Sequence, residues 1–359
     1  MKIAIDISAV VYGTGVSVYT KNLVENLIKI DRVNEYILFG ASLRRRTELY
    51  TFLSTFKEKS LQGKVFSIPP TLADFIWNRV HILPIERLIG KVNVFHSSDW
   101  TQPPSNAFRV TTVHDLVPIK FSTLTSPKIV STHHARLKWV KKEIDRVIVP
   151  SMTTAKDVER MGINKDRIRI IPEAPSPQFK PSKKIEVEKL KSKYRISGKY
   201  LLAVGVNSRK NTQRIIDAFE KTKTETGFKL VVIGHQYIKI DQKRGIIFTG
   251  HIPQADLPRF YSGAEALIYP SLYEGFGIPI LESFVCSTPV VTSNLGSMAE
   301  VAGKAAVLVD PYDVNSITEG ILEAISNKEK LIRLGSERVK LFSWQKTAEE
   351  TLKVYGESQ

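Results

Sequence analysis

Short apolar runs rich in β-branched residues alternate with helical patterns along the whole chain of 359 residues. Such alternation is typical of βα units, which place their strands in parallel sheets. The strand-like runs fall into two groups. The first comprises residues 2–8, 35–40, 64–68, 92–96, 109–114 and 146–150, and the second comprises residues 200–205, 229–234, 246–250, 266–269, 289–292 and 305–309. The pattern predicts two doubly wound α/β domains.

A proline-rich segment separates the two groups. Residues 172–181 contain four prolines, and a charged helical pattern follows over residues 183–193. Proline fixes its own φ and has no N–H to donate, so it stiffens a connection and stops either domain's elements from continuing. We therefore predict a first domain at residues 1–174, a second at residues 175–342 and a final helical segment at residues 343–359.

Composition points to a globular protein of the cytoplasm. Apolar residues make up 42% of the chain and charged residues 25%, which is typical of globular domains. No apolar run reaches the length of a membrane span, and Asp6 interrupts the only apolar run near the N-terminus, which argues against a signal peptide. The single cysteine, Cys286, fits a reducing compartment, where we expect it to be a small buried side chain.

The positive charge is concentrated in the first half of the chain. Residues 1–180 contain 27 Lys and Arg against 16 Asp and Glu, with clusters at residues 44–46 and 136–142. A basic face can bind nucleic acid, anionic lipid headgroups or an acidic acceptor. No nucleic-acid-binding motif occurs, so we expect no nucleic-acid partner. Peripheral contact with an anionic membrane, at its inner face, stays open beside the alternative of a solvated surface.

The motif Glu274-Gly-Phe-Gly-Ile-Pro-Ile-Leu-Glu282 follows the predicted strand at residues 266–269. If a helix begins at Ile278 or Pro279, Glu274 lies in the loop before it and Glu282 about one turn inside it. The free amides and positive dipole end of such a helix attract an anion such as a diphosphate. The two carboxylates could then hold hydroxyls at either end of a nucleotide sugar. The alternative is an ordinary loop-to-helix junction with solvated glutamates.

A basic pair, Arg209-Lys210, follows the predicted strand at residues 200–205. Arginine offers a bidentate fork and lysine a point charge, which suit a diphosphate whose negative charge grows as its bond to a sugar breaks. The alternative is a basic pair on the surface. The chain has no Asp-x-Asp motif, so we expect no metal and assign the neutralising role to these cations.

The first half of the chain has two candidate functional features, and each lies at or after the end of a predicted strand. Gly13, Gly15 and Val16 form a loop between the first strand and a predicted helix at residues 18–30. A dinucleotide-binding loop would need a third glycine where Val18 stands, which argues against NAD. His114 ends another strand, where its imidazole could donate a hydrogen bond to a sugar hydroxyl or be a structural histidine.

Together these motifs resemble the retaining glycosyltransferases of family 4, which have the GT-B fold. Besides the two-glutamate motif, the segments that carry the resemblance are residues 248–253, 257–261, 289–293 and 300–311. The resemblance covers the second half closely and the first half more loosely. It implies two Rossmann-like domains facing each other across a cleft, with the last helix crossing back onto the first domain.

The resemblance also implies roles for single residues. Arg209 and Lys210 would stabilise the leaving diphosphate, and His114 and Glu274 would act on the transferred sugar. The residues implied in donor binding are Gly13, Gly15, Val16, Gly275, Phe276, Gly277, Ile278 and Glu282, the last on the ribose hydroxyls. Further residues resemble the family's scaffold or acceptor wall (His96), an orienting residue of the loop (Asp115) and the nucleobase wall (residues 234–235 and 250–253).

The reaction so implied is metal-independent transfer of a hexose, with retention, from a nucleoside-diphosphate sugar to a glycan or lipid-linked acceptor. No cofactor is implied besides this donor substrate. The residues of these motifs look most like those of mannosyltransferases that use GDP-mannose, which favours GDP-mannose over UDP-hexose donors. The alternatives are a nucleotide-sugar epimerase or hydrolase on the same fold, which would turn over without an acceptor, and an inactive scaffold that binds nucleotide sugars.

The different positions of the two glutamates generate a first prediction. Glu282→Gln is expected to weaken nucleotide binding, whereas Glu274→Gln is expected mainly to lower turnover. Titration calorimetry with the nucleoside diphosphate, together with a turnover assay, separates the two effects. Equal nucleotide affinity for the wild type and Glu282→Gln would contradict the assignment.

Overall fold

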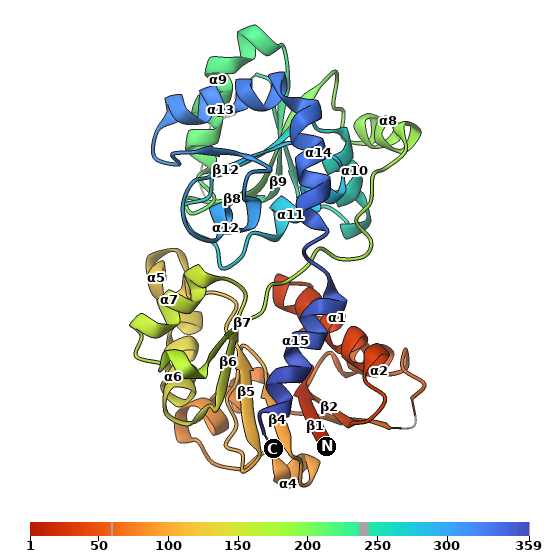
Figure 1. The fold of residues 1–359 in the computed structure, drawn as a ribbon, viewed down its shortest axis with the longest axis vertical. Coiled ribbons are helices and arrows are strands. Elements are labelled where there is room, and N and C mark those ends of the chain that lie inside the picture. Colours follow the sequence, from red (N-terminus) through yellow and green to blue (C-terminus); the bar gives the residue numbers. More distant parts are fainter. Residues whose placement is uncertain (59, 237–243, 359) are drawn as a thin grey trace. The chain divides into compact units, whose positions relative to one another are not determined.

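The computed structural model describes residues 1–58, 60–236 and 244–358, and these form two compact units (Figure 1). The first unit comprises Met1–Glu173 and Trp344–Gln359, and the second comprises Ala174–Ser343. The divisions fall within one residue of the boundaries predicted at residues 174 and 342. The chain therefore enters the second unit through the proline-rich segment and returns to the first for its last helix.

The first unit is built on a seven-stranded parallel sheet with the order β3-β2-β1-β4-β5-β6-β7. Its strands are β1 (Lys2–Asp6), β2 (Glu35–Ala41), β3 (Leu61–Phe66), β4 (Val94–Ser97), β5 (Phe108–Thr112), β6 (Arg146–Val149) and β7 (Ile168–Ile170). The strand predicted at residues 64–68 begins three residues earlier, and the short edge strand β7 was not predicted. Three residues are too few to show a sequence pattern of their own.

The helices of the first unit cover both faces of this sheet. They are η1 (Ser8–Val11), α1 (Gly15–Ile30), α2 (Arg46–Leu53), α3 (Pro70–Ala73), η2 (Asp74–Val80), α4 (Glu86–Ile89), α5 (Val117–Lys120), η3 (Ser122–Leu124), α6 (Pro127–Glu143), α7 (Met152–Arg160), η4 (Lys165–Arg167) and α15 (Trp344–Gly356).

The second unit has a six-stranded parallel sheet with the order β10-β9-β8-β11-β12-β13. Its strands are β8 (Tyr200–Val206), β9 (Lys229–Gln236), β10 (Ile246–Gly250), β11 (Ala266–Tyr269), β12 (Val290–Ser293) and β13 (Val307–Val309). Its helices are α8 (Lys184–Lys193), α9 (Thr212–Thr226), η5 (Gln254–Asp256), α10 (Leu257–Gly263), α11 (Ile278–Val285), α12 (Gly296–Ala302), α13 (Val314–Ser326) and α14 (Lys328–Val339).

Both sheets run outward in two directions from their first strand, which confirms the prediction of two doubly wound α/β domains. Alternate side chains of a buried strand point to opposite faces, and β8 shows this directly. Leu201 and Ala203 belong to one hydrophobic cluster, whereas Tyr200 and Leu202 belong to the cluster on the other face. The strand order reverses between β1 and β4 in the first sheet and between β8 and β11 in the second, and ligands of such folds bind at these points.

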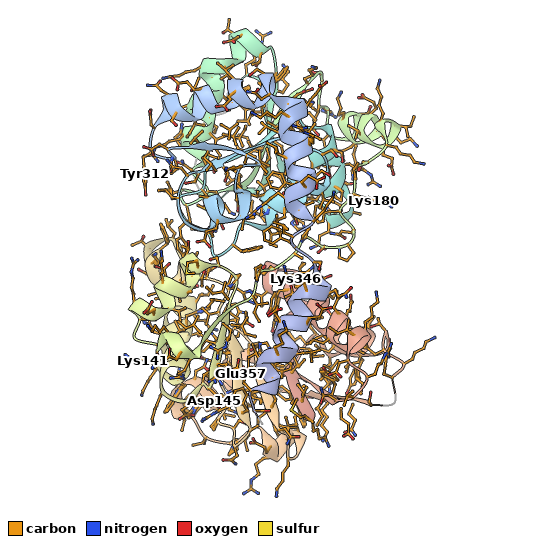
Figure 2. The ribbon with its side chains drawn as sticks, in the orientation of Figure 1. Lys141, Asp145, Lys180, Tyr312, Lys346 and Glu357 are labelled. Atoms are coloured by element: carbon orange, nitrogen blue, oxygen red, sulfur yellow. The ribbon has the colours of Figure 1, made fainter. Side chains whose placement is uncertain are left out.

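Helix α15 packs against α1 and completes the first unit. The Tyr355 hydroxyl lies 2.7 Å from His96 Nδ1, and the other ring nitrogen lies 2.9 Å from the Thr112 hydroxyl. Burial lowers the pKa of His96 to about 3, so this histidine is neutral and acts as scaffold. Beyond the helix, Glu357 (labelled in Figure 2) accepts a 2.6 Å hydrogen bond from Arg169.

In the part of the chain that the structure describes, none of the helices combines the length and apolar character that crossing a bilayer requires.

The contact between α15 and β4 generates a second prediction. Tyr355→Phe leaves a ring nitrogen of the buried His96 without its partner, which costs about 1–3 kcal/mol of unfolding free energy in the first unit. Calorimetric unfolding of the wild type and variant measures the loss. Tyr50→Phe, which changes an exposed tyrosine on α2, is the matched control and should shift stability by less than about 0.5 kcal/mol. Equal shifts for the two variants would contradict the role given to Tyr355.

Candidate active site

The two-glutamate motif forms a loop and the first turn of α11, which begins at Ile278 as the sequence predicted. Gly277 precedes the helix with a φ of 107°, a left-handed conformation that side chains with a Cβ rarely adopt. Pro279 lies in the first turn, where its missing N–H costs nothing. Glu274 therefore lies in the loop, and Glu282 lies inside the helix.

Glu274 meets both cations of the Arg209-Lys210 pair. Glu274 Oε2 lies 2.7 Å from Arg209 Nη1, and Oε1 lies 2.8 Å from Lys210 Nζ. Lys210 Nζ also donates to the Tyr269 hydroxyl at 2.5 Å, and Arg209 donates to the Tyr273 carbonyl at 2.7 Å. The loops after β8 and β11 thus converge at the point where the second sheet reverses its strand order.

Glu274 is ionised within this cluster. Burial by itself would raise the pKa of its carboxyl, but Lys210 and Arg209 outweigh that effect and lower the pKa to about 2. The cluster therefore carries two positive charges and one negative charge, next to the N-terminus of α11. A net positive charge combined with the positive dipole end of α11 favours an anionic ligand.

Asn211, which was not among the residues predicted for the site, fixes the loop that carries the cations. It has a left-handed φ of 63°, and its buried side-chain amide donates to the carbonyls of Pro270 and Pro311 at 3.0 and 2.6 Å. The asparagine itself was the signal in the sequence, because asparagine tolerates the left-handed conformation better than any other residue except glycine. Gly205 matters for the same loop, since a Cβ there would lie 2.8 Å from Lys210 Cγ.

Glu282 has a different environment from Glu274. Its Oε2 accepts a hydrogen bond from the hydroxyl of the buried Tyr261 at 2.9 Å. Burial raises the pKa of its carboxyl to about 7. Near neutral pH this group therefore exchanges between the acid and the carboxylate.

His114 lies just beyond β5 at the carboxyl edge of the first sheet. Its Nδ1 donates to Glu173 Oε1 at 2.8 Å, and Tyr19 packs edge-on at 4.4 Å between ring centroids. Burial works against the charged ring, yet Glu173 outweighs it and the pKa of His114 is raised. Glu173 was not singled out from the sequence, because it lies among the linker prolines. Asp115 accepts from the Val117 amide and so orients the loop.

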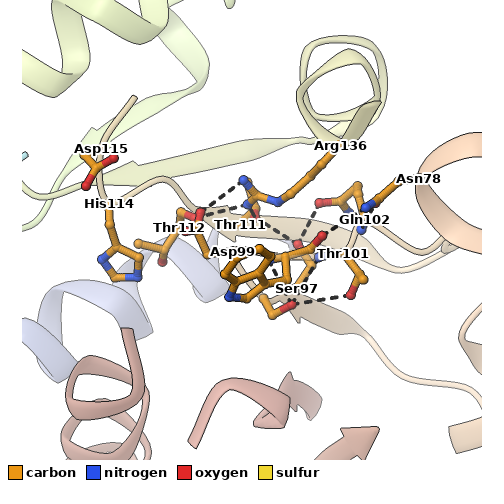
Figure 3. Close-up of polar contacts among 12 residues, drawn as sticks. Asn78, Ser97, Asp99, Thr101, Gln102, Thr111, Thr112, His114, Asp115 and Arg136 are labelled. Carbon is orange, nitrogen blue, oxygen red and sulfur yellow. Dashed lines mark hydrogen bonds and ion pairs between the residues drawn. The ribbon is translucent and has the colours of Figure 1, made fainter. Parts of the chain in front are cut away.

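A buried polar network supports this edge (Figure 3). The Arg136 guanidinium lies 3.1 Å from Asp99 Oδ1 and donates to the Thr111 hydroxyl at 2.6 Å. Arg136 is fully buried, so the basic face expected over residues 136–142 begins after it. The sequence prediction was wrong on this residue because the apolar face of α6, rather than the charge pattern, decides which way its side chain points.

The glycine loop continues directly into α1, which begins at Gly15 rather than at residue 18. Thr14 caps the helix, since its hydroxyl accepts from the Ser17 amide and the Ser17 hydroxyl accepts from the Thr14 amide. Gly13 has a φ of 68°, which requires a residue without a Cβ or with high tolerance for this conformation.

Beside this loop lies a pocket of about 460 Å³ in the first unit, within the range of small-molecule sites. Its walls include Tyr12, Trp77 and Trp100, with Lys128 at the start of α6. A smaller neighbouring cavity is lined by His114 and by the buried Asp6. The Oδ2 atom of Asp6 has no hydrogen-bond partner within the described ranges, and burial raises the pKa of this carboxyl.

The residues expected at the nucleobase end are close together at the edge formed by β9 and β10. The rings of His235 and His251 stack with 5.6 Å between their centroids. Residues 237–243, which follow β9, are outside the described ranges. Across those ranges, no group of three His, Cys, Asp or Glu side chains is arranged to hold a metal ion.

The structure thus brings Arg209, Lys210 and Glu274 into direct contact, and Glu282 follows on the adjoining helix. In the first unit, His114 lies at the carboxyl edge of the sheet. It lines the smaller cavity together with Val16 of the glycine loop.

Two family models match this chain. Residues 13–175 match the model described as "Glycosyltransferase Family 4", and residues 186–340 match "Glycosyl transferases group 1". The two matches together cover most of the chain and correspond to the two units. The chain belongs to the GT-B glycosyltransferases that combine these two domains.

Relatives of known function support this membership, and a solved structure has a similar fold. The chain is 29% identical to the O-antigen chain mannosyltransferase B of Escherichia coli, over 73% of this chain and 74% of that protein. It is 26% identical to the serotype-specific mannosyltransferase WbdA of Escherichia coli over 66% of this chain, which is only 32% of the length of WbdA. The structure of Anabaena Alr3699/HepE with UDP-glucose matches with a TM-score of 0.71 at 14% identity, covering 99% of this chain and all of that one.

The raised pKa of Glu282 generates a third prediction. Hydroxyl groups of a ligand donate to the carboxylate, so binding favours the ionised form. Affinity for a nucleoside diphosphate should therefore rise with pH through about 7 and weaken by up to about tenfold per pH unit below it. Calorimetric titrations from pH 5.5 to 8.5 measure this slope.

Glu282→Gln supplies the matched control, because it removes the titrating group and keeps the shape of the side chain. The variant should keep only the pH dependence that belongs to the ligand's own phosphate. An unchanged slope in the variant would exclude Glu282 as its origin.

Proposed function

We propose that this glycosyltransferase moves a hexose, with mannose favoured, from a nucleoside-diphosphate sugar to a glycan or lipid-linked acceptor, with retention and without a metal ion. The observation that carries the proposal is the cluster of Arg209, Lys210 and Glu274 beside the N-terminus of α11.

The cluster suits the leaving group of such a reaction. When the bond between the sugar C1 and the diphosphate oxygen breaks, negative charge grows on the diphosphate. Arg209 and Lys210 are already fixed in a partly buried site, so they would stabilise this charge without reorganising. The positive dipole end of α11 would add to the effect. These fixed charges would take the part that a metal ion takes in other transferases.

The two glutamates would bind different parts of the ligand. Glu274, with the amides of Gly275, Phe276 and Gly277, would hold hydroxyls of the transferred sugar, and Glu282 would accept the ribose hydroxyls. Because Glu274 also pairs with both cations in the free protein, an incoming diphosphate would share them with it. Donor binding and sugar positioning would then depend on the same carboxylate.

Retention follows from a front-face path. The C1–oxygen bond to the diphosphate breaks, the leaving phosphate oxygen takes the proton of the acceptor hydroxyl, and that hydroxyl oxygen bonds to C1 on the same face. His114 would donate a hydrogen bond to the sugar, and the contact with Glu173, which raises its pKa, keeps its ring protonated to higher pH. No protein nucleophile is required in this path.

The donor and acceptor are supported by separate observations. Relatives named as mannosyltransferases favour GDP-mannose, although a structure of similar fold holds UDP-glucose. For the acceptor, the 460 Å³ pocket beside the glycine loop offers aromatic walls. A lipid-linked acceptor would place the protein at the cytoplasmic face of a membrane, in keeping with the basic first half.

The first test is a thermal-shift panel with UDP, GDP, ADP and NAD, followed by transfer assays with the matching sugar donor. A nucleotide at ~100 times its dissociation constant adds about 2.7 kcal/mol to the folded state, which gives a clear shift. We expect GDP to shift the transition most and NAD to leave it unchanged. Turnover should require acceptor, persist in EDTA and give a product whose anomeric configuration, read by NMR, matches the donor.

Variants connect this activity to the cluster. Arg209→Gln and Lys210→Gln should each lower kcat by roughly 10²–10³-fold. Lys189→Gln, at an exposed position on α8, is the matched control and should leave kcat unchanged. Donor turnover without an acceptor would favour an epimerase or hydrolase, and a nucleotide shift without any turnover would favour an inactive scaffold that binds nucleotide sugars.

A further inference from the structure

Large apolar side chains are exposed together at one place on the first unit. Leu72, Phe75, Val80, Ile82 and Leu83 lie within twelve residues of α3, η2 and the turn that follows, and they are between 36% and 56% exposed. Single exposed apolar residues are normal on protein surfaces, but a contiguous group marks an interaction site. We call residues 72–83 the apolar segment.

The backbone holds the end of this segment in an unfavourable conformation. His81 and Leu83 have φ values of 58° and 63°, in the left-handed region that costs residues with a Cβ about 1–2 kcal/mol each. Trp77, on the buried side, holds the turn by donating its indole N–H to the Leu83 carbonyl at 3.1 Å. The Ile82 amide donates to the Ile76 carbonyl at 3.1 Å. The turn is thus fixed with Ile82 and Leu83 outward, and such strain is found where a surface has a function.

Helix α6 lies directly against the apolar segment. The Trp139 indole N–H donates to the Asn78 carbonyl at 2.7 Å. The His81 ring stacks on the Trp139 ring with 3.5 Å between centroids, and Arg79 donates to the Ser131 hydroxyl at 3.1 Å. The exposed faces of α6 and of the apolar segment are therefore neighbours.

The exposed face of α6 is basic. Lys138 and Lys142 place their ammonium groups 4.9 and 5.0 Å from the Trp139 ring, next to His81, while Lys141 is also exposed and is labelled in Figure 2. The only acidic residue in α6, Glu143, pairs with His81 at 2.9 Å. A positive margin thus flanks the exposed apolar side chains.

We propose that the apolar segment and the basic face of α6 together bind an anionic lipid bilayer. Apolar side chains would enter the boundary between headgroups and acyl chains, and the lysines would contact anionic headgroups while their methylene stems stay in apolar surroundings. A second copy of this chain would bring like charges together, and lysine is depleted from protein–protein interfaces. Charge complementarity therefore favours the bilayer as the occupant.

This surface is formed by elements that also line the pocket proposed for the acceptor. Ala73 and Trp77 of α3 and η2, and Lys128 and Ile129 of α6, line the 460 Å³ pocket. The elements that would contact the bilayer are therefore also walls of the pocket assigned to the acceptor. In this respect the inference rests on the proposed function: a lipid-linked acceptor would reach the pocket along the membrane surface.

Vesicle co-sedimentation of the full chain tests the proposal. Binding to vesicles of phosphatidylcholine with 30% phosphatidylglycerol should exceed binding to phosphatidylcholine alone by at least about tenfold and should weaken in 0.5 M salt. Phe75→Ser with Ile82→Ser should lower the partition coefficient at least about tenfold. Lys138→Gln with Lys142→Gln should lower it by a similar factor, since each cation near an anionic surface contributes about fivefold.

Two matched controls use exposed positions of the same unit. Val33→Ser with Leu43→Ser removes exposed apolar residues elsewhere, and Lys21→Gln with Lys29→Gln removes two lysines of α1. Both controls should bind vesicles like the wild type. The proposal is overturned if they lose as much binding as the test variants, if lipid charge has no effect, or if Phe75→Ser with Ile82→Ser instead abolishes a dimer seen by ultracentrifugation.

A nucleotide thermal shift on the same preparations separates this inference from the proposed function. A normal nucleotide shift without vesicle binding overturns the membrane surface alone. Vesicle binding without any nucleotide shift overturns the glycosyl-transfer proposal and leaves the membrane surface standing.

Discussion

The carboxylate of Glu274 lies between Arg209 and Lys210, and the loops that follow β8 and β11 are held together through it. Two cations in a partly buried site repel each other and lose hydration, and the carboxylate between them offsets both effects. Asn211 connects the same loops through backbone carbonyls. The start of α11, and with it Glu282, depends on where the second loop ends.

In the first unit, a different set of polar contacts fixes the loops at the carboxyl edge of the sheet. At the carboxyl edge of its sheet, a buried guanidinium contacts Asp99 and threonine oxygens of the neighbouring strand (Figure 3). This network fixes the loop after β4, while Glu173 fixes His114 beyond β5. In both units a buried ion pair orders loops that carry polar side chains toward the open edge. The βα scaffold supplies the edge, and the ion pairs give it a defined shape.

Most of the fold could be predicted from the sequence, because buried parallel strands are apolar along their length and βα units recur. The beginning of α11 was also predictable, since glycine and proline act locally. Contacts between residues that are far apart in the sequence could not be predicted. The pairing of Glu173 with His114 joins residues 59 positions apart, and the contact of Arg136 with Asp99 joins residues 37 positions apart. The short strand β7 and the cap at Thr14 were missed because each involves too few residues to form a sequence pattern.

The return of α15 to the first unit has a consequence for synthesis on the ribosome. The first unit lacks its last helix until the whole second unit has been translated, so His96 and the face of α1 that α15 covers stay without their native partners during that time. The second unit, by contrast, is one continuous stretch of chain. We therefore expect the order of maturation to be opposite to the order of the two units along the chain, with the second unit reaching its native packing first.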